Sequence, residues 1–338
     1  LPTKQLWYAV SLTIKEALLF VLPLIIFSLL FNSMMQMSHK AFKLVLMLIP
    51  AVCLSNFITT WVAYFSGHFF VKEMTLVALE SQDALTPLWQ FALPKWIANE
   101  KAMFSGILLG VFFGKYQVSR GEKIAKTLYG VSMGLLNKIF IPIMPVFIFG
   151  FLLKLKHEDI LSSIIQTYAY VFLIIGFTQF CYICLLYGVG TQFKPKAWIA
   201  ALQNIMASVV TGFSTMSSAA ALPFTLEGAR KNTKKPEVAN FVVPTTVNIH
   251  LIGDCIAIPI LAIAILHSFG FGDISLLQFM VFAVHFVVAK FAVAAVPGGG
   301  ILVMLPILGE YLHFDAGMLS LITTLYILFD CIITSMNV

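Results

Sequence analysis

The chain has 338 residues, of which 60% are hydrophobic and 11% are charged, and its formal net charge is +6. Soluble domains carry about 25% charged residues, so the composition excludes an ordinary soluble domain and indicates a polytopic membrane protein. The basic residues lie in short connections between apolar runs, which excludes a nucleic-acid-binding module. The five cysteines lie inside apolar runs, so we expect neither a metal or redox site among them nor a cofactor.

Continuous apolar stretches of about 20 residues are long enough to cross a bilayer as helices. In chain order, we predict such helices at residues 6–35, 42–71, 86–115, 127–153 and 160–189. Another is predicted at residues 238–268, and a last one begins near residue 314. Because the chain starts without Met and ends inside an apolar run, we expect further residues at both ends.

Two further apolar stretches are interrupted in the middle. Residues 197–231 contain a Ser- and Thr-rich run at 211–218, and residues 274–310 contain Pro297 followed by three glycines. Interrupted helices persist at membrane depth only where protein or a water-filled cavity meets the freed backbone groups. Paired interruptions of this kind indicate the substrate site of a secondary transporter. We therefore predict two re-entrant helical hairpins, at 197–231 and 274–310.

The charges of the connections support the two hairpins. If both hairpins return to the side on which they start, one side of the membrane receives twelve basic residues and the other five. The twelve are Lys40, Lys43, Lys115, Arg120, Lys123, Lys126, Lys194, Lys196, Arg230, Lys231, Lys234 and Lys235. The positive-inside rule makes that side cytoplasmic.

Four motifs occur in a fixed order along the chain. They are Pro87-Leu88-Trp89-Gln90-Phe91 within 86–116, Ser217-Ser218-Ala219-Ala220-Ala221-Leu222-Pro223, Ala294-Ala295-Val296-Pro297-Gly298-Gly299-Gly300, and Phe329-Asp330 followed by Thr334 and Met336-Asn337-Val338. Their order and spacing resemble the dicarboxylate/amino acid:cation symporter family, the glutamate-transporter homologues, over nearly the whole chain.

The resemblance implies an all-α polytopic membrane protein that works as an elevator-type transporter and assembles as a homotrimer. Scaffold helices would lie at 1–36 and 81–156, and the transport domain would comprise 37–80 and 157–338. The second hairpin would be the extracellular gate. We expect a symporter and not an enzyme, in a bacterial inner membrane, with membrane lipid and a small-molecule substrate, an amino acid or a dicarboxylate, as its partners.

Asp330 is the most informative charged residue, because a carboxylate in the middle of a predicted span is costly and is a functional candidate. Thr334 and Asn337 follow at i+4 and i+7, on the same helix face. The resemblance implies that Asp330 holds the α-amino group of the substrate. It also implies that Thr334 helps to bind the amino acid and that Asn337 lies near the ion or the substrate.

The two hairpin tips supply the other candidate substrate residues. Ser217 and Ser218 offer hydroxyl and backbone N–H donors that suit a carboxylate at a helix N-terminus. Pro297, Gly298 and Gly299 allow close backbone approach. The alternatives are ordinary serine capping at the first tip and a plain loop break at the second.

Two departures from the family pattern concern the substrate. Family members that bind acidic amino acids carry Arg three residues after the aspartate, whereas this chain has Ile333, and Met216 stands in place of an arginine in the first tip. A butyl side chain cannot replace a guanidinium fork. We therefore predict a neutral or zwitterionic amino acid, with an acidic amino acid or dicarboxylate as the alternative. A cationic substrate is a further reading if Asp254 faces its side chain.

Other departures concern the coupling ion. The resemblance places sodium-coordinating oxygens at positions where this chain has Ile252, Ala51 and Val52, and a serine ligand where it has Lys290. Sodium coupling is therefore in doubt, and proton linkage becomes the alternative. The candidate coupling residues are Asn248, His250, Asp254, Lys290 and Asn337. Lys290 either replaces a bound cation or extends to the membrane interface, and His250 either carries a proton or bonds locally.

Two functions of other classes were weighed against transport. Gly253-Asp254 and Phe329-Asp330 faintly resemble the paired aspartates of an intramembrane aspartyl protease, but their order along the chain is reversed. A channel would show currents without a saturable substrate site. Transport remains the reading that accounts for both interrupted segments.

Overall fold

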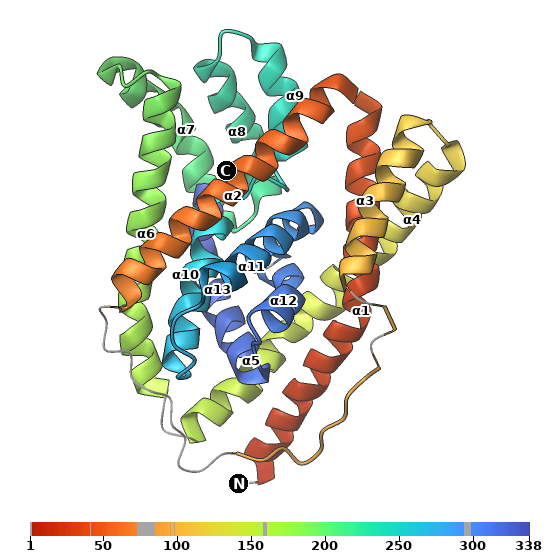
Figure 1. Ribbon diagram of the computed structural model, residues 1–338, viewed down its shortest axis with the longest axis vertical. Helices are drawn as coiled ribbons and strands as arrows, with labels where there is room; N and C mark the ends of the chain where they lie inside the picture. The colour runs from red at the N-terminus through yellow and green to blue at the C-terminus, as the bar shows by residue number, and fades with distance from the viewer. Residues whose placement is uncertain are drawn as a thin grey trace.

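The protein is helical in every regular element of the computed structural model, which describes residues 2–40, 42–72, 85–94, 96–97, 99–157, 161–293 and 299–338 (Figure 1). The elements in chain order are α1 (Pro2–Lys40), α2 (Phe42–Lys72), α3 (Asn99–Lys115), α4 (Ser119–Leu135), the π-helix η1 (Leu136–Phe140), α5 (Ile141–His157), α6 (Leu161–Gly190), α7 (Pro195–Thr215), α8 (Ser218–Asn232), α9 (Pro236–Thr246), α10 (Ile252–Ser268), α11 (Leu276–Ala289), the 3₁₀-helix η2 (Lys290–Ala292), α12 (Gly299–Tyr311) and α13 (Ala316–Asn337).

Within the described ranges, four helical stretches are long and apolar enough to cross a membrane. They are Met47–Val71, Tyr168–Gly190, Pro195–Thr215 and Ala316–Asn337. The number becomes five if Ser119–Phe140 and Pro145–Lys154, which meet at 45°, form one bent span. The all-helical, membrane-spanning class predicted from the sequence is thus confirmed.

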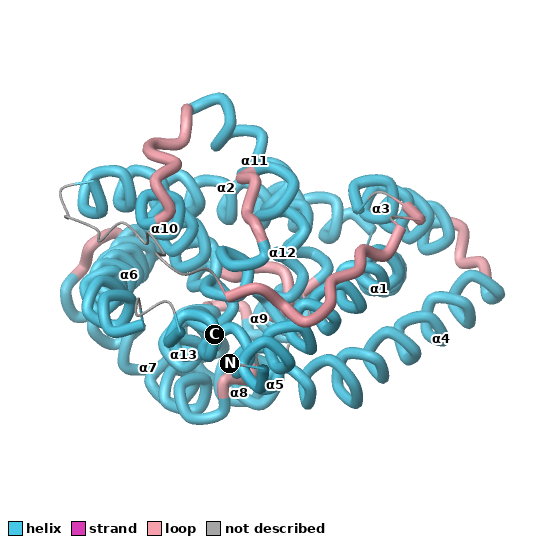
Figure 2. The backbone as a smooth tube through the Cα atoms, turned by 90° about the horizontal axis from the view of Figure 1, so that it is seen from below, coloured by secondary structure: helices cyan, strands magenta, loops and turns pink. Residues whose placement is uncertain are grey.

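The helices form two groups. In one group, α1 packs along α3, α4 and α5; in the other, α10 packs against α2, α6 and α13, and α13 packs against α7. Figure 2 shows α1, α3 and α4 on one side of the molecule and α6, α7, α10 and α13 on the other. Helix α5 contacts both α1 and α13 and so lies where the groups meet. The connections 116–118, 191–194 and 233–235 lie at one end of the molecule (Figure 1).

The predicted span at 86–115 is wrong in its first half. The described residues between 85 and 97 are not helical, and α3 begins only at Asn99. Pro87 and Pro94 explain the difference, because proline lacks a backbone donor and disfavours a helical conformation in the residue before it. The extended segment is bonded to α1 instead: the indole nitrogens of Trp89 and Trp96 donate to Thr13 Oγ1 (3.0 Å) and the Phe20 carbonyl (2.7 Å).

Two other predicted spans are not single straight helices. The span at 127–153 is divided by the π-helical turn η1 and bends before Pro145, a common cause of a kink. The span at 238–268 is divided into α9 and α10 by a turn at residues 247–251. The second break matters for function, because it lies inside the molecule.

Both predicted hairpins form as pairs of packed helices. Arms α7 and α8 are joined by Met216 and Ser217 alone, so the predicted Ser- and Thr-rich loop at 211–218 is mostly helix. Thr211 and Thr215 lie within α7, where their hydroxyls donate to carbonyls one turn earlier, at 2.8 Å each. Arms α11 and α12 contact each other as well, and every residue from Gly299 to Leu308 is buried.

Candidate functional site

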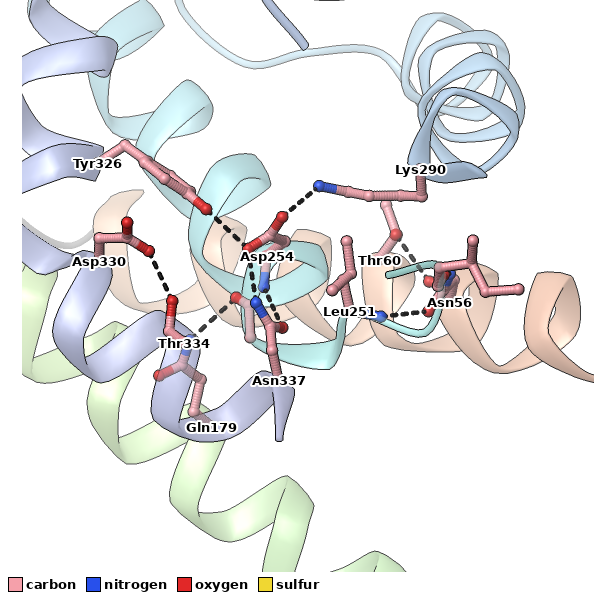
Figure 3. A network of polar contacts seen from close by, with 12 residues as sticks. Asn56, Thr60, Gln179, Leu251, Asp254, Lys290, Tyr326, Asp330, Thr334 and Asn337 are labelled. Carbon is pink, nitrogen blue, oxygen red and sulfur yellow. Dashed lines mark hydrogen bonds and ion pairs between the residues drawn. The ribbon is translucent and has the colours of Figure 1, made fainter. Parts of the chain in front are cut away.

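The polar centre of the molecule lies where the turn between α9 and α10 meets α13 and the second hairpin (Figure 3). The turn frees backbone groups that a continuous helix would pair, and the buried amide of Asn56 binds two of them. Asn56 on α2 donates to the Ile249 carbonyl (2.7 Å) and accepts from the Leu251 N–H (3.4 Å). Gln179 on α6 donates to the Gly253 carbonyl (3.0 Å). The break in the span is therefore stabilised by specific hydrogen bonds within the fold.

Asp254, in the first turn of α10, is the hub of this centre. Its Oδ1 accepts from the Tyr326 hydroxyl (3.0 Å) and from Asn337 Nδ2 (2.9 Å). Its backbone N–H donates to Asn337 Oδ1 (3.3 Å), so Asn337 contacts it twice. Its Oδ2 lies 2.9 Å from Lys290 Nζ. Gly253 lets α10 approach this closely, because a Cβ there would overlap the Ile333 carbonyl of α13.

Lys290 and Asp254 form an ion pair with side chains 0% and 1% exposed. The interpretation that Lys290 extends to an interface is therefore wrong: its ammonium lies inside the protein, 4.5 Å from the centre of the Phe286 ring. A buried ammonium needs a paired carboxylate and further contacts to offset its desolvation. The structure brings these two predicted residues together from positions 36 apart in sequence.

Asp330 and Thr334 form a second polar pair one turn along α13 from Tyr326. Thr334 Oγ1 donates to Asp330 Oδ1 at 2.8 Å, as their i, i+4 spacing predicts. Both side chains are buried, and Figure 3 shows Asp330 on the same side of α13 as Tyr326. Ile333 is fully buried but does not line the cavity described next.

A cavity of about 20 Å³ lies beside Asp254 and has room for one water molecule. It is lined by Met216, Ser218, Val247, Asn248, Leu251, Asp254, Val293, Gly300, Tyr326 and Asn337. The first tip and both arms of the second hairpin thus meet at one point. Among the described residues, Asn248 Oδ1 is a buried acceptor without a hydrogen-bond partner.

The tips themselves are held by local geometry. Met216 adopts a left-handed conformation, with φ of 50°, and ends α7. Ser217 caps α8 by accepting from the Ala220 N–H (3.4 Å), and Ser218 is the buried residue that lines the cavity. Gly299 and Gly300 begin α12, whereas Pro297 and Gly298 lie outside the described residues.

His250 lies on the opposite side of the turn. Its Nε2 is 2.8 Å from Ser55 Oγ, and it lines a separate cavity of about 200 Å³. Within the described ranges, no group of three or more His, Cys, Asp or Glu side chains is placed to hold a metal ion. His250 therefore does not share the Asp254 centre, although it is bonded locally.

Three functional candidates were not predicted from the sequence: Asn56, Gln179 and Tyr326. Each is a polar residue inside an apolar helix, which is by itself a signal of function or of a required partner. Tyr326 also precedes Asp330 by four residues, on the face already singled out. The missing information was the break at 247–251, which creates the backbone groups that Asn56 binds.

The sequence matches the family model of the sodium:dicarboxylate symporter family over residues 4–338. The chain belongs to this family. It is therefore a multi-pass integral membrane symporter and not an enzyme, which excludes the aspartyl protease alternative. The resemblance seen in the sequence is confirmed.

Relatives within this family differ in their named substrates. The chain is 23% identical over 307 residues to the serine/threonine transporter SstT of Acinetobacter baumannii (strain AYE), covering 86% of this chain and 76% of that protein. The same transporter of Acinetobacter baylyi is 22% identical over 310 residues, with the same shares. A putative sodium-dependent excitatory amino acid transporter of Caenorhabditis elegans, glt-3, is 32% identical over 159 residues, which are 46% of this chain and 28% of that protein.

Proposed function

We propose that this symporter moves a neutral or zwitterionic amino acid by an elevator mechanism. The observation that carries the proposal is the convergence of the two hairpins on one buried polar centre beside Asp330. The tip of the first hairpin brings Ser218, and the second hairpin brings Gly300 and Lys290. Paired broken helices around a polar centre are the arrangement expected of a transporter substrate site.

In this proposal Asp330 pairs with the α-ammonium group of the substrate, assisted by Thr334. Ser217, Ser218 and the N-terminal backbone of α8 receive the α-carboxylate. No arginine follows Asp330 three residues later, because the position is Ile333. An uncharged substrate side chain avoids leaving a second carboxylate unpaired in a buried site. The serine/threonine transporters that resemble this chain over most of its length support the same substrate class.

The cavity beside Asp254 is too small for an amino acid, so the proposal requires the hairpins to separate when substrate enters. In the proposed motion, one group of helices moves relative to the other. The group of α1, α3, α4 and α5 would be the scaffold, and α2 with α6 to α13 the moving transport domain. A homotrimer assembled through the scaffold, with the second hairpin as gate, completes the proposal.

Uptake into proteoliposomes that contain the purified full chain tests the substrate class. We expect saturable uptake of radiolabelled serine, threonine or alanine that unlabelled glutamate and aspartate do not reduce. Asp330→Asn should lower apparent substrate affinity at least about tenfold, or 1.4 kcal/mol, because it keeps the shape and removes the charge. Unchanged affinity in a folded Asp330→Asn protein would remove this residue from the site.

The second candidate is a sodium-coupled symporter of an acidic amino acid or dicarboxylate. The name of the matched family and the glt-3 relative favour it. It predicts the reverse result in the same assay: uptake of glutamate, aspartate or succinate that is lost when sodium is replaced by choline.

Proton linkage predicts a different result. Substrate affinity would change little with sodium but would shift between about pH 5.5 and 8, and the shift would be lost in His250→Gln.

A further inference from the structure

We propose that Lys290 is a built-in cation, whose ammonium holds at Asp254 the position that an exchangeable monovalent cation would otherwise take. The inference concerns coupling and rests on the proposed function for its effect on transport. The cation site itself does not depend on that function. It follows from the contacts of two side chains, Lys290 and Asp254, and from the elements that carry them.

The first step is the completeness of the burial. The other ion pairs of the described chain have partners that are partly exposed, such as Lys231 and Glu227 at 54% and 61%. Only for Lys290 and Asp254, among the described residues, are both partners sealed from solvent. Bulk water therefore cannot stabilise either charge, and each depends on the other.

The second step is that the two carboxylate oxygens of Asp254 have different partners. Oδ1 is occupied by two neutral donors, Tyr326 and Asn337, which orient the carboxylate without neutralising it. Oδ2 has the ammonium of Lys290 as its partner. Asp330, the acidic residue on α13, accepts a hydrogen bond from Thr334 instead. A single positive charge at Oδ2 is thus what this centre requires.

The third step is that the cation belongs to the second hairpin. Lys290 lies where α11 passes into η2, in the first arm, and Gly300 approaches from the second arm. A Cβ on Gly300 would lie 2.5 Å from Asp254 Oδ2, so the backbone of α12 covers the same oxygen. Both arms therefore contact one carboxylate, and Figure 3 shows the lysine side chain reaching it from the hairpin.

A tethered ammonium cannot exchange with the solution, in contrast to a bound sodium ion. The charge of Asp254 is therefore neutralised at any sodium concentration. The contact between the second hairpin and α10 is independent of sodium for the same reason. Deleting the ammonium while leaving its space should convert the centre into a site for a free cation. Lys290→Ala does this, and n-propylammonium reproduces the deleted atoms. Lys290→Met is the matched control, because it fills the same space without charge.

The test is thermal unfolding of the purified full chain without substrate, in sodium, choline or n-propylammonium chloride at fixed ionic strength. We expect the wild-type midpoint to be the same in sodium and choline. In choline, Lys290→Ala should unfold at a lower temperature than the wild type. Most of this difference should disappear in n-propylammonium or sodium. The apparent affinity of Lys290→Ala for either cation should be at least about tenfold higher than that of Lys290→Met. Stabilisation of the wild type by sodium, or equal recovery of both variants, would overturn the proposal.

If Lys290→Ala does not fold, the double variant Asp254→Asn with Lys290→Met keeps the proposal testable. It replaces the ion pair by two neutral side chains, so it should fold and be insensitive to sodium. Sodium stabilisation of that protein would place the cation site elsewhere and contradict the inference. Because these measurements use no substrate, recovery of Lys290→Ala by cations together with absence of amino-acid uptake would refute the proposed function alone.

Discussion

The two helical hairpins are built alike but are held in different ways. The arms of the first hairpin are bonded to each other by polar side chains: Ser208 on α7 is bonded to Thr225 on α8 (2.5 Å), and Asn204 donates to Asn232 (2.8 Å). Its outer face is apolar and exposed, as Phe213 shows. Its ion pair, Lys231 with Glu227, lies on the surface. Changes at these bonds between the arms, away from the tip, should therefore have local effects.

The second hairpin is held by the rest of the molecule. Phe279, Phe282 and Phe286 of α11 are fully buried, and so is the whole of α12 as far as Leu308. Its ion pair joins it to α10 at the polar centre. The comparison shows that two hairpins of similar local fold can differ in how strongly they interact with the rest of the protein. Substitutions in the second hairpin should affect both stability and the site.

The largest contrast should come from the two lysines. Lys290→Met leaves the Asp254 carboxylate buried without its cation and should cost about 3–5 kcal/mol of folding free energy. Lys231→Met on the first hairpin breaks an exposed pair that solvent screens, and it should leave the free energy of unfolding almost unchanged. Denaturant unfolding in detergent measures both. Similar losses for the two variants would remove the proposed difference between the hairpins.

A smaller contrast is expected from two glycines. In Gly300→Ala the new Cβ would meet the Tyr326 hydroxyl and Asp254, and in Gly228→Ala it would lie 2.6 Å from the Asn204 carbonyl. Overpacking of this kind costs about 1–3 kcal/mol in either hairpin. Only Gly300→Ala should also weaken substrate binding, because only it disturbs the polar centre. If both variants changed the substrate affinity equally, measured by uptake, the packing of the first hairpin would affect the site as strongly as that of the second hairpin.

The smallest effect should come from Ser208→Ala, which removes the hydroxyl contact between the arms of the first hairpin. The loss should be about 0.5–1.5 kcal/mol, because Thr225 keeps its bond to the Ala221 carbonyl (3.1 Å). Substrate affinity should stay unchanged. A marked fall in affinity with little loss of stability would mean that packing between the arms controls the site directly.

The sequence by itself determined the helical class, both hairpins and the face of α13 that carries Asp330, Thr334 and Asn337. These follow from hydropathy and from helical spacing, which are properties of single segments. The resemblance to the family also singled out Asp254 and Lys290, through the positions that they occupy in the family pattern. Proline positions could have corrected the span at 86–115, and the hydroxyl-rich run at 211–218 was mistaken for a loop.

Only the tertiary structure decided which buried polar groups meet. It placed the break at 247–251, bound the backbone of that break to Asn56, and paired Lys290 with Asp254 and not with the membrane interface. The physical reason is that burial makes a partner obligatory for each polar group without specifying which one. That choice depends on how helices distant in sequence pack, and a hydropathy pattern carries no record of it.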